Sequence, residues 1–344
     1  MTVDYIIVGQ GLAGSWLCHH LLAAGKEVLV ADKYNPFSAS RVSSGVVNPI
    51  TGRNLVKTWL FDELLAFAMP AYRQMEQLLN LPLWEERNFV WLLQSEHDLN
   101  KFTARTENPA YAQHILATQR GEWRTGFRSL TGYAQVGGYY LNSPAFIDAY
   151  RQYLLSQNRL VEDWVNADEL ILLPDAVQWK GITAQKIIFC NGYHAAAHPF
   201  FSHLPFAPNK GEALIIQSDY LAGLEKYMVK GGNFLVPKGN NQFWVGSQYL
   251  FQNLTQEPTP AIRAQMEATL SKMLTAPYTV VNQIAGIRPS TQQRRPLVGL
   301  HPQRPQIGLL NGLGTKGTLM SAYFAHKFVQ HLLHNQPLPP EVCW

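Results

Sequence analysis

The sequence predicts an α/β fold of two interleaved lobes, one with a parallel sheet between helices and one of α+β type with an antiparallel or mixed sheet. Three observations predict it. A strand, a glycine-rich turn and a helix follow one another at the start of the chain, the same order returns near its end, and short strands separated by turn residues lie between. With 344 residues the chain is long enough to bury a large core in more than one lobe.

The N-terminal unit has the spacing of a dinucleotide-binding βαβ motif. A strand over residues 5–8 runs into the turn, where Gly9 permits a tight bend, Gly11 lets a pyrophosphate approach the backbone and Gly14 lets the helix pack closely on the sheet. The free N–H groups at the helix start then face the phosphates. The residues expected to line the turn are Gly9, Gly11, Leu12, Ala13 and Gly14.

An acidic residue follows the second strand of this unit. Asp32 comes eighteen residues after Gly14, where a carboxylate can accept hydrogen bonds from both hydroxyls of an adenosine ribose, and Lys33 comes next. A glycine-rich turn in an ordinary α/β domain is the alternative interpretation, but it leaves Asp32 unexplained.

Composition narrows the class of protein. The formal net charge of +4 is mild and no run of Lys or Arg concentrates it, so a nucleic-acid partner is not expected. Cys18, Cys190 and Cys343 lack the spacing of a disulfide framework or a zinc site. We expect no signal peptide, no membrane span and a reducing cytoplasm as the location. His194, His198 and His203 have no matched carboxylate, so no metal site is expected.

The middle of the chain predicts these elements in order. Residues 35–54 predict a long loop near the phosphates, residues 59–79 and 143–155 predict helices, and Gly239-Asn240-Asn241 predicts a hairpin turn. The expected strands are 89–93, 160–164, 170–173, 186–190, 210–218, 233–237, 242–247, 279–287 and 306–310. A closing helix is expected over 315–333.

The second glycine cluster, residues 311–318, indicates which dinucleotide the chain binds. A nicotinamide enzyme does not need it, whereas a flavin lies far from its adenosine, and a second helix N-terminus aimed at the N1–C2=O edge stabilises the reduced anion. Lys316 would add a full positive charge there. The alternative is a helix with a glycine-rich start and an exposed lysine.

Five motifs together resemble the D-amino-acid oxidase superfamily, which includes glycine oxidase, sarcosine oxidase and the oxidase domain of a bifunctional tRNA-modifying enzyme. They occur in family order across nearly the whole chain. The motifs are Gly9 to Gly14 with Asp32-Lys33, residues 39–45 (ASRVSSG), residues 187–192 (IIFCNG), residues 286–289 (GIRP) and residues 312–317 (GLGTKG).

The resemblance implies a Rossmann-type FAD-binding lobe with noncovalently bound FAD, since no attachment residue is suitably placed. It assigns residues 1–81, 142–204 and 285–344 to that lobe, and residues 82–141 and 205–284 to a substrate lobe. Besides the first turn, the FAD contacts that it implies are Asp32, Lys33, Ser40, Arg41, Ser43, Ser44, Gly45, Val46, Val165, Gly192, Gly312, Gly314, Thr315, Lys316, Gly317 and Thr318.

The resemblance also implies the substrate chemistry. Arg288 would bind a substrate carboxylate bidentately over the flavin, so that the α C–H points at flavin N5 and hydride transfer oxidises the C–N bond of a small amino acid or secondary amine. Tyr249 and Tyr139 or Tyr140 would line the pocket and donate hydrogen bonds. The alternatives are an arginine that satisfies loop carbonyls and tyrosines that belong to the core.

One position departs from the family. Trp244 stands where sarcosine oxidases carry a lysine that is thought to help oxygen react, so the electron acceptor is either O2 or a quinone or protein. Two other functions stay open: oxidation of a modified tRNA base, which residues 43–49 also resemble, and a flavin-binding redox sensor without turnover.

Overall fold

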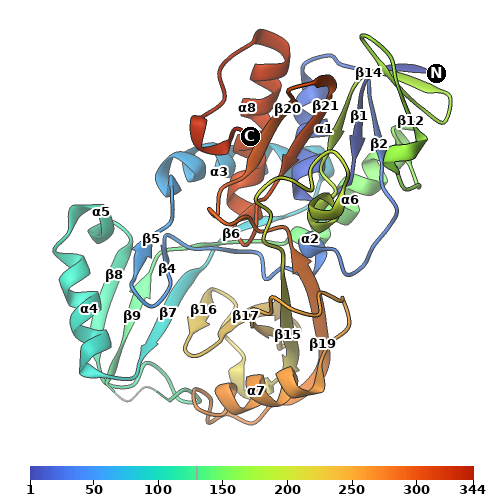
Figure 1. Cartoon of the computed structure of the whole chain (residues 1–344). Coiled ribbons are helices and arrows are strands. Elements are labelled where there is room, and N and C mark those ends of the chain that lie inside the picture. Colours follow the sequence, from blue (N-terminus) through green and yellow to red (C-terminus); the bar gives the residue numbers. More distant parts are fainter. Residues whose placement is uncertain (129–130) are drawn as a thin grey trace.

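The computed structural model describes residues 1–128 and 131–344. Figure 1 shows two lobes. The upper lobe holds β1, β14, β20, β21, α1 and α8, and the lower lobe holds β7, β9, β15, β19 and α7. The chain crosses between the lobes repeatedly, as the order of the strands within each sheet shows. The predicted α/β class with a second lobe on a mixed sheet is confirmed.

The sheet of the upper lobe has a parallel centre. Its strands run β11-β2-β1-β14, and β14 continues the parallel pairing into β21, while β12, β13 and β20 join antiparallel. Both faces of β1 are buried, since Tyr5 and Ile7 enter one core cluster and Ile6 and Val8 another, as expected of a parallel strand between helices and loops. The strands are β1 (Thr2–Val8), β2 (Val28–Ala31), β11 (Leu160–Val161), β12 (Leu170–Leu172), β13 (Val177–Trp179), β14 (Ile182–Phe189), β20 (Leu297–His301) and β21 (Arg304–Asn311).

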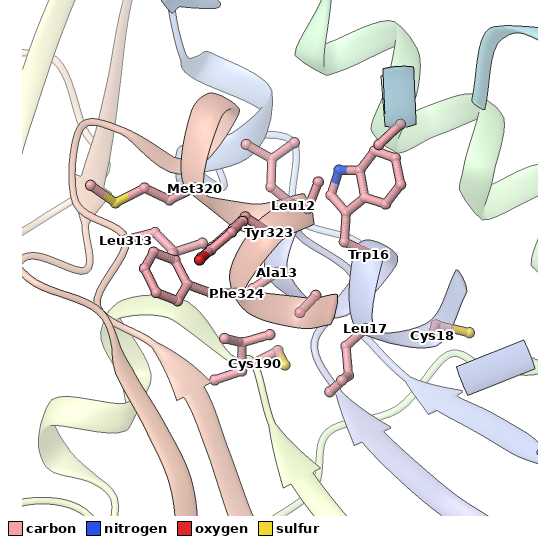
Figure 2. Packing of buried hydrophobic residues seen from close by; sticks show 14 of the residues in the cluster. Leu12, Ala13, Trp16, Leu17, Cys18, Cys190, Leu313, Met320, Tyr323 and Phe324 are labelled. Carbon is pink, nitrogen blue, oxygen red and sulfur yellow. The ribbon is translucent and has the colours of Figure 1, made fainter. Parts of the chain in front are cut away.

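Four long helices pack on this lobe: α1 (Leu12–Ala23), α3 (Phe61–Leu79), α6 (Ser143–Ser156) and α8 (Gly317–His334). Helices α1 and α8 lie side by side, and Figure 2 shows Leu12 of α1 near Leu313 and Met320 at the start of α8. Trp16 and Phe324 are fully buried in the same cluster. Burial of this shared apolar surface fixes the two helices, and hence the two glycine turns that precede them, relative to each other.

The lower lobe is built on a mixed sheet in the order β19-β15-β18-β17-β16-β7-β9-β8, antiparallel except for the pair β16 and β7. Its outer face packs on α7 (Pro260–Leu270). The strands are β7 (Asn88–Leu93), β8 (Ile115–Arg120), β9 (Gly132–Val136), β15 (Asn209–Gln217), β16 (Tyr227–Lys230), β17 (Phe234–Gly239), β18 (Gln242–Gly246) and β19 (Thr279–Arg288).

The inner face of this sheet turns toward the upper lobe. It carries Trp244 and Val236, which pack with Ile50 and Leu55 of a small hairpin. That hairpin is β4 (Ile50–Thr51) with β5 (Val56–Lys57), and a further small sheet joins β3 (Val46–Val47), β10 (Tyr139–Leu141) and β6 (Trp84–Glu86). The remaining helices are α2 (Ala39–Val42), α4 (Glu96–Thr106) and α5 (Pro109–Ala112).

Several expected boundaries need correction. The strand expected over residues 186–190 begins at Ile182. Residues 35–54 are not wholly irregular, because α2, β3 and β4 lie within them. The strand expected over residues 160–164 ends at Val161, and the closing helix begins at Gly317 rather than Thr315. The strand β19 crosses the expected lobe boundary at residue 284, so the division into lobes stays a prediction at that point. No helix among the described residues has the length and apolarity to cross a bilayer.

Candidate active site

The first glycine turn is tight because its glycines lie against backbone. Gly9 has φ +100°, and a Cβ there would lie 2.6 Å from the carbonyl oxygen of Cys190. A Cβ on Gly14 would lie 1.9 Å from the carbonyl oxygen of Gly9, and one on Gly11 would lie 3.0 Å from Oγ of Ser40. These distances forbid a larger side chain at Gly9 and Gly14, so the strand end and the helix start approach as the motif requires.

Three buried polar atoms around this turn lack a hydrogen-bond partner among the described residues: Gln10 Oε1, Arg41 Nη2 and Asn191 Oδ1. The side chain of Arg41 is only 6% exposed, and its Nε donates to Asp148 Oδ1 at 2.9 Å. An unpaired buried polar group costs about 1–3 kcal/mol, so such groups are normally paired with a ligand or water. Donors and acceptors beside bare backbone fit the pyrophosphate and ribose of a dinucleotide.

Asp32 already has protein partners on both carboxylate oxygens. Its Oδ1 accepts the Gln10 N–H at 2.9 Å, and its Oδ2 accepts from Arg151 Nη1 at 2.7 Å. Burial raises the pKa of Asp32, against the lowering effects of Gln10 and Arg151. Each carboxylate oxygen can accept a second hydrogen bond, so the predicted ribose contact stays a prediction.

The loop over residues 38–48 lies between the two helix starts. Its Ser40 Oγ accepts the Leu12 N–H of α1 at 3.1 Å, and its Val46 carbonyl accepts from Thr318 Oγ1 of α8 at 3.4 Å. A Cβ on Gly317 would lie 3.4 Å from Leu12 Cδ1. The two glycine turns are therefore neighbours and share one loop.

The same loop also contacts the inner face of the lower sheet. A Cβ on Gly286 of β19 would lie 2.4 Å from Val42 Cγ2, and Trp244 Nε1 of β18 donates to the Val42 carbonyl at 3.2 Å. The loop thus brings the ends of β18 and β19 close to both helix starts.

Lys316 stands at the second glycine turn. The turn uses positive φ at Gly312 and Gly314, and the Gly314 N–H donates to the Pro289 carbonyl at 3.2 Å. Lys316 Nζ donates to Asn48 Oδ1 at 2.5 Å, and no ion pair among the described residues includes this lysine. Burial lowers the pKa of Lys316 to about 7. The amine thus sits at the start of α8 with only a neutral partner.

Arg288 is the last residue of β19. Two residues later, Ser290 lies against that glycine turn. Its Nη1 donates to Asn209 Oδ1 at 2.7 Å and to the Gln248 carbonyl at 3.5 Å, and its Nη2 donates to Ser247 Oγ at 2.5 Å. A Cβ on Gly211 would lie 2.1 Å from Nη2, so the guanidinium crosses β15 over this glycine. Burial lowers the pKa of Arg288.

All of these partners of Arg288 are neutral. No acidic side chain among residues 1–128 and 131–344 forms an ion pair with it. The contacts named use part of the five N–H donors of a guanidinium. An uncompensated, half-buried cation with spare donors is suited to bind an anion.

The predicted pocket tyrosines have different surroundings. Tyr249 is 55% exposed, and its ring faces Arg288, with the guanidinium carbon 4.5 Å from the ring centroid. The ring of Tyr139 stacks on Trp84 at 5.5 Å, and the hydroxyl of Tyr140 accepts from Lys238 Nζ at 2.9 Å. Of these three tyrosines, Tyr249 is the one whose ring lies against Arg288.

The other predicted FAD contacts differ in their exposure to solvent. Val165 is buried beside Val8 and Ala31, and Gly45 has φ +78° and would clash with Leu141 if it carried a Cβ. Ser43, Ser44, Gly192 and Gly317 are half-buried, whereas Lys33 and Thr315 are exposed.

Five residues that contact the predicted site residues were not predicted from the sequence. They are Asn48, Arg151, Asn209, Gly211 and Ser247. Each acts on a predicted residue across a long sequence separation. No local motif marks such pairs, and only the folded chain brings them together.

Comparison with protein families gives one match that spans the chain. The family is DAO, described as FAD dependent oxidoreductase, and it matches residues 4–330. Among curated proteins, the tRNA 5-methylaminomethyl-2-thiouridine biosynthesis bifunctional protein MnmC of Marinobacter nauticus (strain ATCC 700491 / DSM 11845 / VT8) is 23% identical over 361 residues. The match covers 96% of this chain but only 56% of that relative, so the chain spans about half of its length.

Solved structures share the whole fold at low sequence identity. Iminodiacetate oxidase from Chelativorans sp. BNC1 has a TM-score of 0.79 at 20% identity, with 98% of both chains covered. Glycine oxidase from Geobacillus kaustophilus has a TM-score of 0.80 at 18% identity, covering 98% of this chain and 96% of its own. These similarities establish the architecture of both lobes.

Proposed function

Because this chain belongs to the DAO family of FAD dependent oxidoreductases, we propose that it oxidises the C–N bond of a small amino acid or secondary amine that carries a carboxylate. The single observation that carries the proposal is Arg288, a half-buried cation whose hydrogen-bond partners are all neutral. The names of the structural neighbours, an iminodiacetate oxidase and a glycine oxidase, support the same substrate class.

FAD is the cofactor, and the residues of the two turns fit it. Gly9 and Gly14 leave bare backbone, and Arg41 Nη2 and Asn191 Oδ1 are free to bind its polar groups. When bound, FAD accepts the hydride that leaves the substrate carbon. We propose noncovalent binding, through the loop over residues 38–48 that touches both helix starts.

Three side chains would organise the reaction. Arg288 binds the carboxylate and so fixes which face of the substrate is presented. Tyr249, whose ring faces Arg288, covers the exposed side of the guanidinium. Lys316 and the start of α8 supply positive charge at the second turn, and a pKa of about 7 lets Lys316 hold or release its proton near neutral pH.

Anaerobic bleaching of the flavin tests the proposal. FAD-loaded protein is mixed with glycine, sarcosine, L-proline and a panel of D-amino acids, each paired with the amine that lacks the carboxylate. We expect at least one carboxylate-bearing amine to bleach the flavin much faster than its decarboxylated partner. Equal bleaching within every pair would contradict the role of Arg288, and no bleaching at all would favour a redox sensor without turnover.

A modified tRNA base is the second candidate substrate, because the match to the tRNA-modifying relative covers nearly all of this chain. Binding of such a substrate would depend on phosphate contacts and fall steeply with salt. Salt-sensitive tRNA binding together with flavin bleaching by modified tRNA would favour it over the amino-acid proposal.

We propose a cytoplasmic location, which the three free cysteines support. The electron acceptor is proposed to be O2 or a quinone. Reoxidation of the reduced flavin by air, compared with reoxidation by a soluble quinone, distinguishes the two.

A further inference from the structure

Asn209 lies directly opposite Arg288 in the antiparallel pair of β15 and β19. Its side chain is 4% exposed, and its amide is used at both ends. The Oδ1 accepts from Arg288 Nη1 at 2.7 Å, and the Nδ2 donates to Ser290 Oγ at 2.7 Å. Because donor and acceptor are both engaged, this amide has one favoured orientation, with its oxygen toward the guanidinium.

The path of the Arg288 side chain needs this support. The guanidinium crosses β15 above Gly211 and reaches Ser247, which follows the next strand, β18. Asn209 holds one Nη group and Ser247 holds the other, so the plane of the guanidinium is set by hydrogen bonds to β15 and to the residue after β18. A long arginine side chain without such support loses a fixed direction.

The neutrality of Asn209 matters as much as its geometry. An aspartate at this position would have the same shape and would pair with Arg288 permanently, as buried opposite charges do. The amide gives orientation without a competing charge, so the full charge of Arg288 remains for a ligand.

Asn209 also connects Arg288 to the second glycine turn. Its partner Ser290 faces that turn, since a Cβ on Gly314 would lie 3.3 Å from Ser290 Oγ. The same turn carries Lys316 two residues later. The Asn209 amide therefore links Arg288, through Ser290, to the turn that precedes α8.

We propose that Asn209 is a positioning residue, which orients the guanidinium of Arg288 toward the substrate carboxylate and, being neutral, leaves its charge available. This inference rests on the proposed function, in which Arg288 binds that carboxylate.

The test measures binding of carboxylate probes to FAD-loaded protein by calorimetry and by the change in flavin absorption. Acetate and benzoate are the probes, and acetamide and benzamide are their neutral counterparts. We expect Asn209→Asp to weaken binding of both carboxylates at least tenfold and to leave binding of the amides within twofold of the wild type. Asn209→Ser, which removes the support without adding charge, should weaken the carboxylates about threefold or more, and it decides the matter if Asn209→Asp does not fold.

Asn282→Asp is the matched control, because it adds the same charge to β19 at an exposed position far from Arg288. It should leave every affinity within twofold. A merely structural role would lower FAD affinity and melting temperature and weaken acids and amides alike, and that result overturns the inference. Unchanged carboxylate affinity in both Asn209 variants also overturns it.

Arg288→Met separates this inference from the proposed function. If the wild type and Arg288→Met bind the carboxylates equally, or if neither binds them, the carboxylate role of Arg288 fails and the inference with it. If Arg288→Met abolishes binding and the Asn209 variants do not change it, only the inference fails.

Discussion

At the scale of single residues, the proposed site is centred on two basic side chains, neither of which has an acidic partner among the described residues. Arg288 is held by Asn209 and Ser247, and Lys316 by Asn48. Charges that are partly withdrawn from water without an acidic partner are costly, and proteins retain them where a ligand supplies the opposite charge. The arrangement therefore indicates an anion that arrives from outside the chain.

Arg288→Met should raise the KM for a carboxylate-bearing substrate roughly 10- to 100-fold, because charge-assisted hydrogen bonds contribute about 1.5–3 kcal/mol. FAD content should stay the same, since Arg288 has no contact with the first glycine turn among the described residues. Steady-state kinetics and the flavin spectrum measure both. Arg263→Met, on the exposed surface of α7, is the control and should leave KM unchanged.

Lys316 predicts a pH dependence of apoprotein stability. Burial lowers its pKa from 10.5 to about 7, so between those pH values the unfolded chain binds a proton that the folded chain does not, and stability rises with pH. The stability of the folded state is reduced most below pH 7, because there the folded chain must carry the Lys316 ammonium.

Lys316→Met should therefore stabilise the apoprotein at pH 6 by at least about 1 kcal/mol, the equivalent of one pKa unit, and by less toward pH 10. Melting temperatures of both proteins across this range provide the measurement, with Lys33→Met, an exposed lysine, as the control. A difference between wild type and Lys316→Met that does not vary with pH would contradict the lowered pKa.

At the scale of elements, glycines decide how closely a strand end, a helix start and a loop approach. Gly14 lets α1 reach the carbonyl of Gly9, and Gly211 lets a guanidinium cross β15. The loop over residues 38–48 then contacts α1, α8 and β18 in turn. No single element contains the site, because its parts come from several elements that are brought together by contacts such as these.

Gly14→Ala should destabilise the protein by roughly 1–3 kcal/mol and weaken FAD binding, because the new methyl group would meet the Gly9 carbonyl at 1.9 Å and backbone cannot move aside easily. Chemical denaturation and FAD titration measure the two effects. Gly137→Ala, whose Cβ would lie 3.8 Å from the nearest carbonyl, should behave as the wild type. Equal behaviour of the two variants would show that the turn accommodates a larger side chain than the structure allows.

At the scale of the whole molecule, the two lobes meet where the cofactor is expected to bind. The start of α8 contacts the loop over residues 38–48, and Tyr72 of α3 donates to the Thr318 carbonyl at 2.9 Å. Burial of α1 against α8 positions both helix starts toward one region. A ligand that contacts both starts adds its binding energy to the stability of the assembled fold.

Removal of FAD should therefore lower the melting temperature, and added FAD should raise it again roughly with the logarithm of the FAD concentration. At 100 times its Kd, FAD is expected to contribute about 2.7 kcal/mol, with no effect from an equal amount of riboflavin, which lacks the adenosine and pyrophosphate. Thermal scans of apoprotein at several FAD concentrations provide the test. A melting temperature independent of FAD would exclude binding specific to the folded state.

The sequence by itself determined the fold class, the family and the cofactor. These depend on local spacing, since a glycine turn between a strand and a helix must have its glycines at fixed offsets, as at Gly9, Gly11 and Gly14. Arg288 was implied by the resemblance of residues 286–289 (GIRP) to a motif of the family.

Only the tertiary structure decided how these residues are held. Asn209 lies 79 positions before Arg288, and Asn48 lies 268 positions before Lys316. Likewise, a cation–π contact placed Tyr249 on Arg288, and ring stacking placed Tyr139 on Trp84. A side-chain partner chosen by the packing of distant elements leaves no periodic trace in the chain, so the neutral surroundings that make Arg288 available for a ligand become visible only when the sheets are assembled.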